Sequence, residues 1–334
     1  MPETPWTPER ILKTGNGYWE SCALHAGVRL GVFDALDRRA LSGEEAADRL
    51  NVTRRGLVPL LNALAAMGLL VKEGGRFSVA AEVRPFLVRG SESYLGDILL
   101  HHHFLMESWA RLPEAVTTGR PTRDGSARAV DPLRQESFLM GMFNLAMRLA
   151  PKVVEAVDLS GRARLLDVGG GPGTYAIQFC LKNPGLSAVV LDLPGTRPFM
   201  ERTAARFGVS DRVTFAEGDF TAGEFPGGFD AAWLSQILHQ EGPDTCRALV
   251  ARAARALAPG GVLLVHEFLL EDTMDRPLPP ALFALNMLVG TDEGRAYSEG
   301  EVASMMAGAG LADVRRLPFT HPGGSGILAG TREG

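Results

Sequence analysis

One stretch of the sequence, residues 164–192, constrains the fold more than any other. It reads RLLDVGGGPGTYAIQFCLKNPGLSAVVLD: an apolar run (Arg164–Val168), closely spaced glycines, a stretch with helical spacing (Tyr175–Leu181) and a second apolar run (Ala188–Leu191). Short apolar runs of this kind are typical of buried parallel strands. Glycines let the backbone approach a ligand, and the start of a helix presents free N–H groups. The stretch therefore predicts a nucleotide-binding strand–helix–strand unit.

The residues around the glycines indicate which nucleotide this unit binds. Gly171, Gly173 and Ala176 fit the G-x-G-x-x-G/A pattern of NAD enzymes, which is a weak signal by itself. Asp167 lies near the end of the first strand, where its carboxylate would repel an NAD pyrophosphate. The same carboxylate would attract the cationic amino acid part of S-adenosylmethionine (SAM). We favour SAM, with NAD and a purely structural turn as the alternatives.

Further candidate cofactor contacts follow the next strands. Asp192 comes about 20 residues after the glycines, where a carboxylate can accept hydrogen bonds from both ribose hydroxyls. Asp219 and Phe220 follow an apolar strand at 213–216 and provide an acceptor and an aromatic ring for an adenine. The full set of expected cofactor-binding residues is Asp167, Gly169, Gly170, Gly171, Gly173, Asp192, Leu193, Gly218, Asp219, Phe220, Ser235 and Gln236.

The composition limits the class of protein. With 334 residues, 46% of them hydrophobic, the chain can bury a large core and is expected to form two domains. A net charge of −5 argues against nucleic-acid binding. The three cysteines form no C-x-x-C pair, so neither a disulfide framework nor a zinc site is expected. The start has no signal-peptide pattern, and no apolar run reaches about 18 residues, so we expect a cytoplasmic protein without membrane contact.

The first hundred residues predict a winged-helix domain. Helices are expected over Tyr18–Leu36, from Ser42 to Asn51 and over Arg54–Leu70, followed by a hairpin at 69–79. A helix that reads DNA needs exposed polar side chains on consecutive turns. The third helix, RRGLVPLLNALAAMGLL, is instead apolar on nearly every face. We expect residues 1–100 to form a dimerisation domain, and a transcription regulator with a SAM-like effector is the alternative.

The rest of the chain, residues 101–334, predicts an α/β domain with a Rossmann-like parallel sheet, because strands and helices alternate along it. Its first part, 101–160, is expected to be a helical region that lines a substrate pocket. His101, His102 and His103 are consecutive on a helix, so they cannot converge on one metal ion. The elements expected at either end of this domain are helices Tyr94–Val116 and Phe138–Val157, a loop over Thr117–Asp131, and an antiparallel strand pair at 313–317 and 326–331.

Two residues at strand ends are candidates for catalysis. His239 follows the strand expected at 229–234, and Glu267 ends the strand expected at 262–267, which places both at the ligand-binding edge of the sheet. An imidazole accepts a proton at neutral pH, and a carboxylate on its other nitrogen fixes the tautomer. The alternatives are a capping or packing role for His239 and a solvated strand end for Glu267.

These motifs together resemble the SAM-dependent O-methyltransferases of the plant caffeate and bacterial polyketide-tailoring type. The resemblance covers almost the whole chain and rests on WARLPEAVTTGRP, LLDVGGGPGTY, LDLP, GDF, ILHQEGPDTC and PGGVLLVHEFLL. It implies a homodimer formed through the winged-helix domain and a seven-stranded class I methyltransferase domain. It also implies methyl transfer without a metal, with S-adenosylhomocysteine (SAH) as product.

The resemblance further implies roles for single residues. His239 matches the general base and Glu267 the carboxylate that orients it, while Met140 and Met287 match positions that line the acceptor pocket. The acceptor is expected to be a phenolic hydroxyl of a small aromatic or polycyclic metabolite, with C- or N-methylation as alternatives. The full set of expected substrate contacts is His103, Met140, Phe143, Met147, Phe283 and Met287.

Three positions depart from the family pattern. Gln240 stands where an Asp is frequent, Ala296 where a second orienting Glu is common, and Ser235 where plant members carry a lysine that contacts SAM. Glu293 is a candidate to compensate for Ala296. If nothing compensates, His239 would be a weak base and catalysis would depend mainly on proximity.

Overall fold

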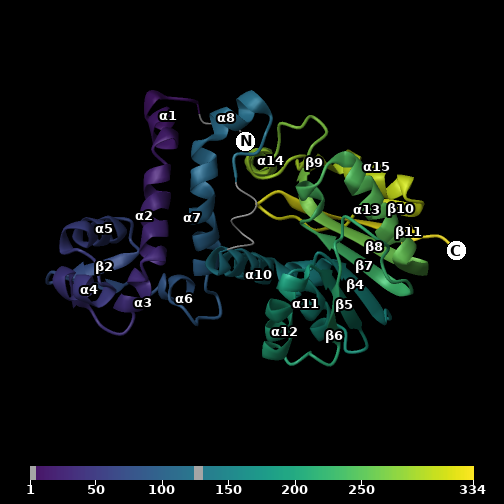
Figure 1. Cartoon of the computed structure of the whole chain (residues 1–334), viewed down its shortest axis with the longest axis horizontal. Helices are drawn as coiled ribbons and strands as arrows, with labels where there is room; N and C mark the ends of the chain where they lie inside the picture. The colour runs from purple at the N-terminus through teal and green to yellow at the C-terminus, as the bar shows by residue number, and fades with distance from the viewer. Residues whose placement is uncertain (1–4, 124–130) are drawn as a thin grey trace. The chain divides into compact units, whose positions relative to one another are not determined.

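The computed structural model of the chain describes residues 5–123 and 131–334 (Figure 1). It divides into two compact units, Met1–Phe104 and Leu105–Gly334, whereas the sequence places the boundary between residues 100 and 101. In the described ranges, no helix has the length and apolar character needed to cross a membrane.

The first unit combines short helices with a small sheet. The strands pair antiparallel in the order β1-β3-β2, and Leu41 lies opposite Phe77. The core between helices and sheet is formed by residues such as Phe33, Leu61 and Leu64. The elements are α1 (Pro8–Gly15), α2 (Tyr18–Arg29), α3 (Val32–Leu36), β1 (Leu41–Ser42), α4 (Gly43–Leu50), α5 (Arg54–Ala66), β2 (Leu70–Glu73), β3 (Arg76–Val79), α6 (Arg84–Leu87) and the start of α7 (Gly96–Ala110).

Local sequence signals account for several boundaries in this unit. Ser42 and Glu45 form the expected capping box: the Ser42 Oγ accepts from the Glu45 N–H at 3.2 Å, and the Ser42 N–H donates to the Glu45 carboxylate at 2.7 Å. The expected helix over Tyr18–Leu36 is wrong as a single helix, because Gly31 adopts φ +72° and separates α2 from α3. The expected third helix also ends earlier than Leu70, at Ala66.

The second unit is built on a mixed sheet. Its seven long strands follow the order β10-β11-β8-β7-β4-β5-β6, and the two-residue strand β9 pairs beside β8. The strands β4 to β8 run parallel, and β11 is antiparallel to both β8 and β10, which confirms the expected Rossmann-like sheet and its antiparallel end. The strands are β4 (Arg164–Val168), β5 (Ser187–Asp192), β6 (Val213–Glu217), β7 (Phe229–Ser235), β8 (Leu257–Leu270), β9 (Tyr297–Ser298), β10 (Leu311–Arg316) and β11 (Ser325–Arg332).

Helices cover both faces of this sheet, as Figure 1 shows. Trp233 of β7 packs with Phe179 on the face covered by α10, α11 and α12, and Leu234 packs with Leu249 on the face covered by α13 and α15. A sheet buried on both faces requires nearly continuous apolar strands, as this sequence has. The remaining helices are α8 (Leu112–Thr118), α10 (Pro132–Ala156), α11 (Thr174–Lys182), η1 (Pro194–Thr196), α12 (Arg197–Arg206), η2 (Leu238–Gln240), α13 (Pro243–Ala256), α14 (Leu278–Gly290) and α15 (Glu299–Gly308).

Several expected boundaries in this unit need correction. The helix expected over Tyr94–Val116 is divided at Arg111 into α7 and α8. The helix expected from Phe138 begins at Pro132, because the Asp131 carboxylate caps it by accepting from the Leu133 N–H at 2.9 Å. The loop expected over 117–131 is wrong at its start, which belongs to α8, and its residues 124–130 lie outside the described residues. The strand expected from Val262 begins at Leu257 and includes Pro259-Gly260-Gly261.

Candidate active site

The expected cofactor and catalytic residues gather at one edge of the sheet. The parallel strands β4, β5, β6, β7 and β8 all end at this edge, and each is followed by one of the motifs found in the sequence. The backbone of Gly169 is fixed at this edge, since its N–H donates to the Leu191 carbonyl of the neighbouring strand at 2.8 Å.

Asp167 is a buried carboxylic acid without a cationic partner among the described residues. It is 1% exposed, and neither oxygen has a hydrogen-bond partner among the described residues. Burial raises its pKa to about 7; the approach of the Ala176 N–H opposes this rise, and the charge of Asp192 adds to it. An unpaired buried anion is costly unless a cationic group meets it. The ammonium group of SAM is such a cation, so this residue fits the cofactor.

The first two glycines after Asp167 stand where a side chain would collide with neighbouring side chains. A Cβ at Gly169, where φ is +65°, would lie 2.7 Å from the Ile237 side chain. A Cβ at Gly170 would lie 2.6 Å from the Asp167 carboxylate. Gly173 precedes α11 with φ +75°, so the first turn of that helix presents its N–H groups beside the glycines. The loop 169–173, called the glycine cradle below, therefore packs closely against the Ile237 and Asp167 side chains and lies at the start of α11.

Asp192 connects the second strand to this cradle. Its carboxylate accepts hydrogen bonds from the N–H groups of Gly171 at 2.8 Å and Leu193 at 2.7 Å, and from the Thr196 hydroxyl at 3.2 Å. Burial raises its pKa, and these hydrogen bonds oppose the rise. A carboxylate offers about four acceptor positions, so one is left for a ribose hydroxyl. Leu193 is half exposed beside it.

The Gly218-Asp219-Phe220 segment lies next to the same cradle. The Phe220 ring is 3.5 Å from the position that a Gly169 Cβ would take. The Asp219 carboxylate accepts from the Thr221 N–H at 2.8 Å and hydroxyl at 2.6 Å, which lowers the pKa of Asp219. Arg252, a residue that the sequence analysis missed, donates to the Phe220 carbonyl at 2.6 Å and to the Thr221 carbonyl at 3.1 Å.

Ser235 and Gln236 follow β7, and both interact with His266. The Ser235 hydroxyl is hydrogen-bonded to the His266 Nδ1 at 2.9 Å, and the Gln236 N–H donates to the His266 carbonyl at 2.9 Å. His266 is fully buried and stacks on Trp233 with ring centroids 5.6 Å apart. Burial lowers the pKa of His266 to about 4, so its ring is neutral. Gln236 adopts φ +59°, and its side-chain oxygen is buried without a partner in the described part of the chain.

His239 and Glu267 are brought together as an imidazole–carboxylate pair. The His239 Nδ1 and the Glu267 Oε1 are 2.8 Å apart, and both side chains are buried. Glu267 also accepts from the Phe268 N–H at 2.9 Å and from the His239 N–H at 3.4 Å. These contacts show that Glu267 is not a solvated strand end. An ionised carboxylate can only accept a hydrogen bond, so this contact is possible with an ionised Glu267 when Nδ1 is the nitrogen that carries a proton.

An aromatic surface lies against the His239 ring. The Phe283 and His239 rings form a T-shaped pair with centroids 4.7 Å apart at 87°, and the Phe268 ring centroid lies 4.5 Å from that of Phe283. The sequence analysis named Phe283 but missed Phe268, whose signal is its position directly after Glu267. Phe283 belongs to α14, which is held in place because Asn286 accepts hydrogen bonds from Trp109 and Arg123, both at 3.1 Å.

The other expected substrate contacts lie elsewhere in the two units. Phe143 of α10 packs against Phe207 with centroids 6.4 Å apart, and the Met147 sulfur accepts from the Gln178 amide at 3.7 Å, so both contact the helices over the sheet. Met140 is half-buried on α10, and Met287 is buried on α14. His103 belongs to the first unit, beside His25 at 6.2 Å. Their roles in substrate binding stay predictions.

The departures from the family pattern also have structural counterparts. Ala296 is buried and places no carboxylate near the imidazole. Glu293 lies against Gly242, where a Cβ would approach its carboxylate to 2.5 Å, and Glu267 is the carboxylate bonded to His239. Across residues 5–123 and 131–334, no cluster of three or more His, Cys, Asp or Glu has the geometry to hold a metal ion.

Comparisons with known proteins identify the family of this chain. An O-methyltransferase domain model matches residues 109–312, and an O-methyltransferase dimerisation domain model matches residues 12–88. The chain is 35% identical to a 3-hydroxy-5-methyl-1-naphthoate 3-O-methyltransferase of Streptomyces sahachiroi, over 99% of this chain and 97% of that protein. It is 33% identical to the tetracenomycin polyketide synthesis 8-O-methyl transferase TcmO of Streptomyces glaucescens, over 94% of each chain.

Solved structures of similar proteins cover the same length. The SAH complex of PigF superposes with a TM-score of 0.90 at 28% identity, over 98% of this chain and 100% of that chain. An O-methyltransferase family protein from Burkholderia thailandensis superposes with a TM-score of 0.87 at 28% identity, over 99% of both chains. The chain therefore belongs to the family of SAM-dependent O-methyltransferases.

Proposed function

We propose that this enzyme methylates a phenolic hydroxyl of a small aromatic or polycyclic metabolite, with His239 as the general base. The observation that carries the proposal is the 2.8 Å hydrogen bond between His239 Nδ1 and Glu267. It leaves Nε2 as the only proton acceptor on the ring. A phenol has an ordinary pKa near 10, so it gains nucleophilicity when a base removes its proton.

Each residue of the pair has a separate task. His239 takes the phenolic proton on Nε2, and Glu267 holds the ring in the required orientation through Nδ1. The carboxylate charge then stabilises the imidazolium that forms, in a buried setting where electrostatic interactions are strong. The N–H of Phe268 fixes Glu267 in turn, at 2.9 Å.

The residues of the glycine cradle would hold the cofactor. We assign the methionine part to Asp167 and the backbone of Gly169, Gly170, Gly171 and Gly173, the ribose to Asp192, and the adenine to Asp219 and Phe220. When bound, SAM supplies a sulfonium methyl group that is electrophilic enough to react with a phenolate. The unpaired Asp167 carboxylate supports this assignment, because it is the buried charge that a cationic ligand would neutralise.

The acceptor class follows from the surface beside the base. Phe283 and Phe268 present aromatic rings next to His239, and such rings favour edge or offset contacts with another aromatic ring. One relative acts, by its name, on a hydroxynaphthoate. We therefore propose a hydroxylated naphthalene or larger polyketide-type ring as the acceptor, and 3-hydroxy-5-methyl-1-naphthoate as the first probe.

The base role is tested with His239→Ala and labelled SAM. We expect turnover of the naphthoate probe to fall by about 100-fold or more, as general-base catalysis contributes that much. Calorimetry should show unchanged SAH affinity. His321→Gln, which removes an imidazole from the loop before β11, is the matched control and should keep full turnover. A His239→Ala enzyme that binds SAH and turns over like the wild type would remove the base role.

Two relatives favour a second candidate, methylation at nitrogen or carbon. The chain is 30% identical to the N,N-dimethyltransferase OxyT of Streptomyces rimosus and 26% identical to an L-tyrosine C(3)-methyltransferase of Streptomyces lavendulae. Carbon-13 NMR of the product made from methyl-labelled SAM separates the three cases, because O-, N- and C-methyl carbons resonate in different ranges. An O-methyl signal supports the proposal, and an N- or C-methyl signal replaces it.

We further propose a homodimer formed through the first unit, with no role in binding nucleic acid. The dimerisation model covers residues 12–88, and α1 and α2 expose large apolar side chains, among them Ile11, Leu12 and Trp19. Burial of such surface stabilises association. Sedimentation should show a dimer for the wild type and a monomer for Trp19→Asp. A gel-shift assay with duplex DNA should show no binding; a shift with steep salt dependence would instead support the regulator.

A further inference from the structure

The turn that carries His239 is contacted by residues of α13 and β9 that have no role in the mechanism proposed above. This turn, η2, follows β7 and precedes α13, so its backbone has few partners within a helix or strand. Its internal bonds are those from Gln240 N–H to the Ile237 carbonyl, 3.2 Å, and from Glu241 N–H to the Leu238 carbonyl, 3.1 Å. The position of the imidazole therefore depends on contacts that come from outside the turn.

Two buried side chains supply hydrogen bonds to the carbonyls on either side of His239. The Tyr297 hydroxyl of β9 donates to the Glu241 carbonyl at 2.6 Å. The Cys246 thiol of α13 donates to the Leu238 carbonyl at 3.1 Å. The two side chains also touch each other, with the sulfur and the hydroxyl oxygen 3.4 Å apart. Both residues are 0% exposed, so water does not compete for these bonds.

The ionisation of both groups favours these bonds. Burial raises the pKa of the Cys246 thiol to about 11, and burial likewise raises the pKa of the Tyr297 hydroxyl. Both groups are therefore protonated donors at neutral pH. In that state each group can donate the hydrogen bond that the geometry shows.

The same segment approaches the turn by a close backbone contact. A Cβ at Gly294 would lie 2.6 Å from the His239 carbonyl oxygen and 2.8 Å from that of Gln240. Cys246 thus binds the Leu238 carbonyl and Tyr297 binds the Glu241 carbonyl. Gly294 packs against the two carbonyls between them. The segment 294–298 and α13 therefore pack against the carbonyl groups of the turn.

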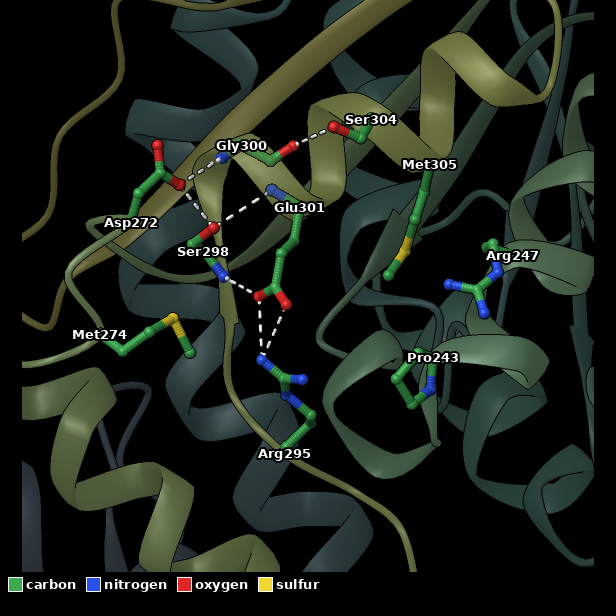
Figure 2. Close-up of a pocket in the computed structure, with 10 residues that line it drawn as sticks. All are labelled: Pro243, Arg247, Asp272, Met274, Arg295, Ser298, Gly300, Glu301, Ser304 and Met305. Atoms are coloured by element: carbon green, nitrogen blue, oxygen red, sulfur yellow. Dashed lines mark hydrogen bonds and ion pairs between the residues drawn. The ribbon is translucent and has the colours of Figure 1, made fainter.

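The segment 294–298 is itself anchored at its far side (Figure 2). Arg295 binds the Glu301 carboxylate through two contacts, 2.8 and 3.0 Å, and the Ser298 N–H donates to the same carboxylate at 2.9 Å. The Ser298 hydroxyl donates to Asp272 at 2.6 Å. These groups line a surface hollow of about 600 Å³, and Figure 2 shows the bonds that link Asp272, Ser298, Glu301 and Arg295. The residues on both sides of Tyr297 are therefore held by hydrogen bonds.

We propose that Tyr297 and Cys246 are positioning residues for the reaction: they fix the η2 backbone so that the His239 Nε2 faces the acceptor hydroxyl. This inference rests on the proposed role of His239 as the base. Small displacements of a catalytic group cost rate because the reacting atoms must be aligned. Among the described residues Glu267 is the carboxylate bonded to the imidazole and Phe283 packs on the ring, and the backbone of η2 is the third constraint on the direction of Nε2.

The test uses Tyr297→Phe, which removes one hydroxyl and keeps the ring, in the full-length enzyme with the naphthoate probe and SAM. We expect kcat to fall about tenfold, as the loss of one hydrogen bond implies, with KM and SAH affinity within about twofold. Cys246→Ala should act in the same direction, and Cys246→Ser, which keeps a donor, should restore most of the rate. Ser304→Ala removes a hydroxyl that donates within α15 in the same hollow, at 2.7 Å from the Gly300 carbonyl, and should leave kcat unchanged.

Two further readouts separate positioning from general loss of structure. In a His239→Asn background, Tyr297→Phe should cause no additional loss of kcat, because its effect passes through the imidazole. The Nδ1 proton of His239, identified in the NMR spectrum by its absence in His239→Asn, should exchange with solvent at least about tenfold faster in Tyr297→Phe. An unchanged exchange rate, or an equal loss of kcat in both backgrounds, would overturn the proposal.

The proton readout also keeps this inference distinct from the proposed function. If His239→Asn retains turnover, the base role fails, yet the exchange rate still reports whether Tyr297 holds the turn. Faster exchange in Tyr297→Phe then shows that Tyr297 holds the turn although His239 is not the base. An unchanged exchange rate contradicts the positioning role of Tyr297 as well.

Discussion

The carboxylate of Asp167 lies so close to the Cα of Gly170 that a Cβ at residue 170 would come within 2.6 Å of it. The backbone of Gly170 is not in the left-handed region, unlike that of Gly169 at φ +65°. Space beside the acid, rather than backbone conformation, therefore explains glycine at position 170. The two neighbouring glycines serve the same loop for different physical reasons.

Gly170→Ala tests this relationship. The added methyl group must displace the Asp167 carboxylate, so we expect affinity for SAH to fall by about tenfold or more with little change in backbone strain. Calorimetric titration measures the loss. Gly185→Ala is the matched control, because a Cβ there meets nothing within 4 Å. Equal affinity in both variants would contradict the proposed role of Asp167 in binding the cofactor.

The buried Asp167 also predicts how stability depends on pH. Its pKa rises from an ordinary 3.8 to about 7 in the folded protein. Between these values the folded state keeps a proton that the unfolded state has released, so the free energy of unfolding falls as pH rises through this window. Above about pH 7 the penalty is complete, on the order of 4 kcal/mol.

Asp167→Asn isolates this effect, because the amide does not ionise. In the absence of ligand, we expect the variant to gain thermal stability relative to the wild type between pH 5 and pH 8, and the difference in Tm to level off above about pH 7. Measuring the difference between the two proteins removes the contribution of the histidines, which titrate in the same range. A difference in Tm that is constant with pH would show that Asp167 is already ionised in the folded protein.

We expect Arg252 to influence cofactor affinity through the loop at Phe220 and Thr221. It is 9% exposed and donates to the carbonyls of Phe220 and Thr221, so Arg252→Met leaves both carbonyls without a donor. We expect loss of about 1–3 kcal/mol of stability and weaker SAH binding, since the loop beside the glycines loosens. Arg255→Met is the control on the same helix: its partner is the exposed Glu224, and such surface pairs contribute little. Similar losses in both variants would argue against a special role for Arg252.

Glu267→Gln tests how much the negative charge of the carboxylate contributes to kcat. The amide oxygen can still accept from His239 Nδ1, so the ring orientation is retained while the negative charge is lost. We expect kcat for the naphthoate probe to fall about tenfold to 100-fold, with unchanged SAH affinity. Glu293→Gln, which alters a carboxylate that lies against Gly242, should leave kcat near the wild-type value. If Glu293→Gln costs more than Glu267→Gln, the assignment of the orienting acid is wrong.

The sequence predicts the sheet well because its signals are local. A short apolar strand followed by glycine or an acid marks each strand end, and parallel strands bring these ends to one edge. For this reason the amino-acid sequence alone is enough to place Asp167, Asp192, His239 and Glu267 at the same edge. The capping box at Ser42 is local in the same way, since both partners lie within one helical turn.

The features that the sequence did not predict depend on distant residues. Tyr297 and Cys246 are 51 positions apart, and Arg252 is 32 positions from Phe220, so no periodic pattern links them. Pro259-Gly260-Gly261 is typical of a turn, yet it lies within β8 at an irregularity, where the pairing with β7 passes from Leu257 directly to Val262. The contacts of Phe143 and Met147 with the helices over the sheet likewise follow from tertiary packing rather than from spacing.

One feature of β8 limits how enzymes of this kind can be recombined. His266 and Glu267 are neighbours that point to opposite faces, the first into a buried aromatic cluster and the second to the imidazole. The register is held on both sides, where His266 lies opposite Ser235 of β7 and Ile327 of β11. A crossover that shifts this strand by one residue would, in one direction, bury the Glu267 carboxylate among aromatic rings and, in the other direction, place His266 where Glu267 now meets His239. Chimaeras of such methyltransferases should therefore inherit β7, β8 and β11 from one parent, and take their crossovers in the surface loops between helices.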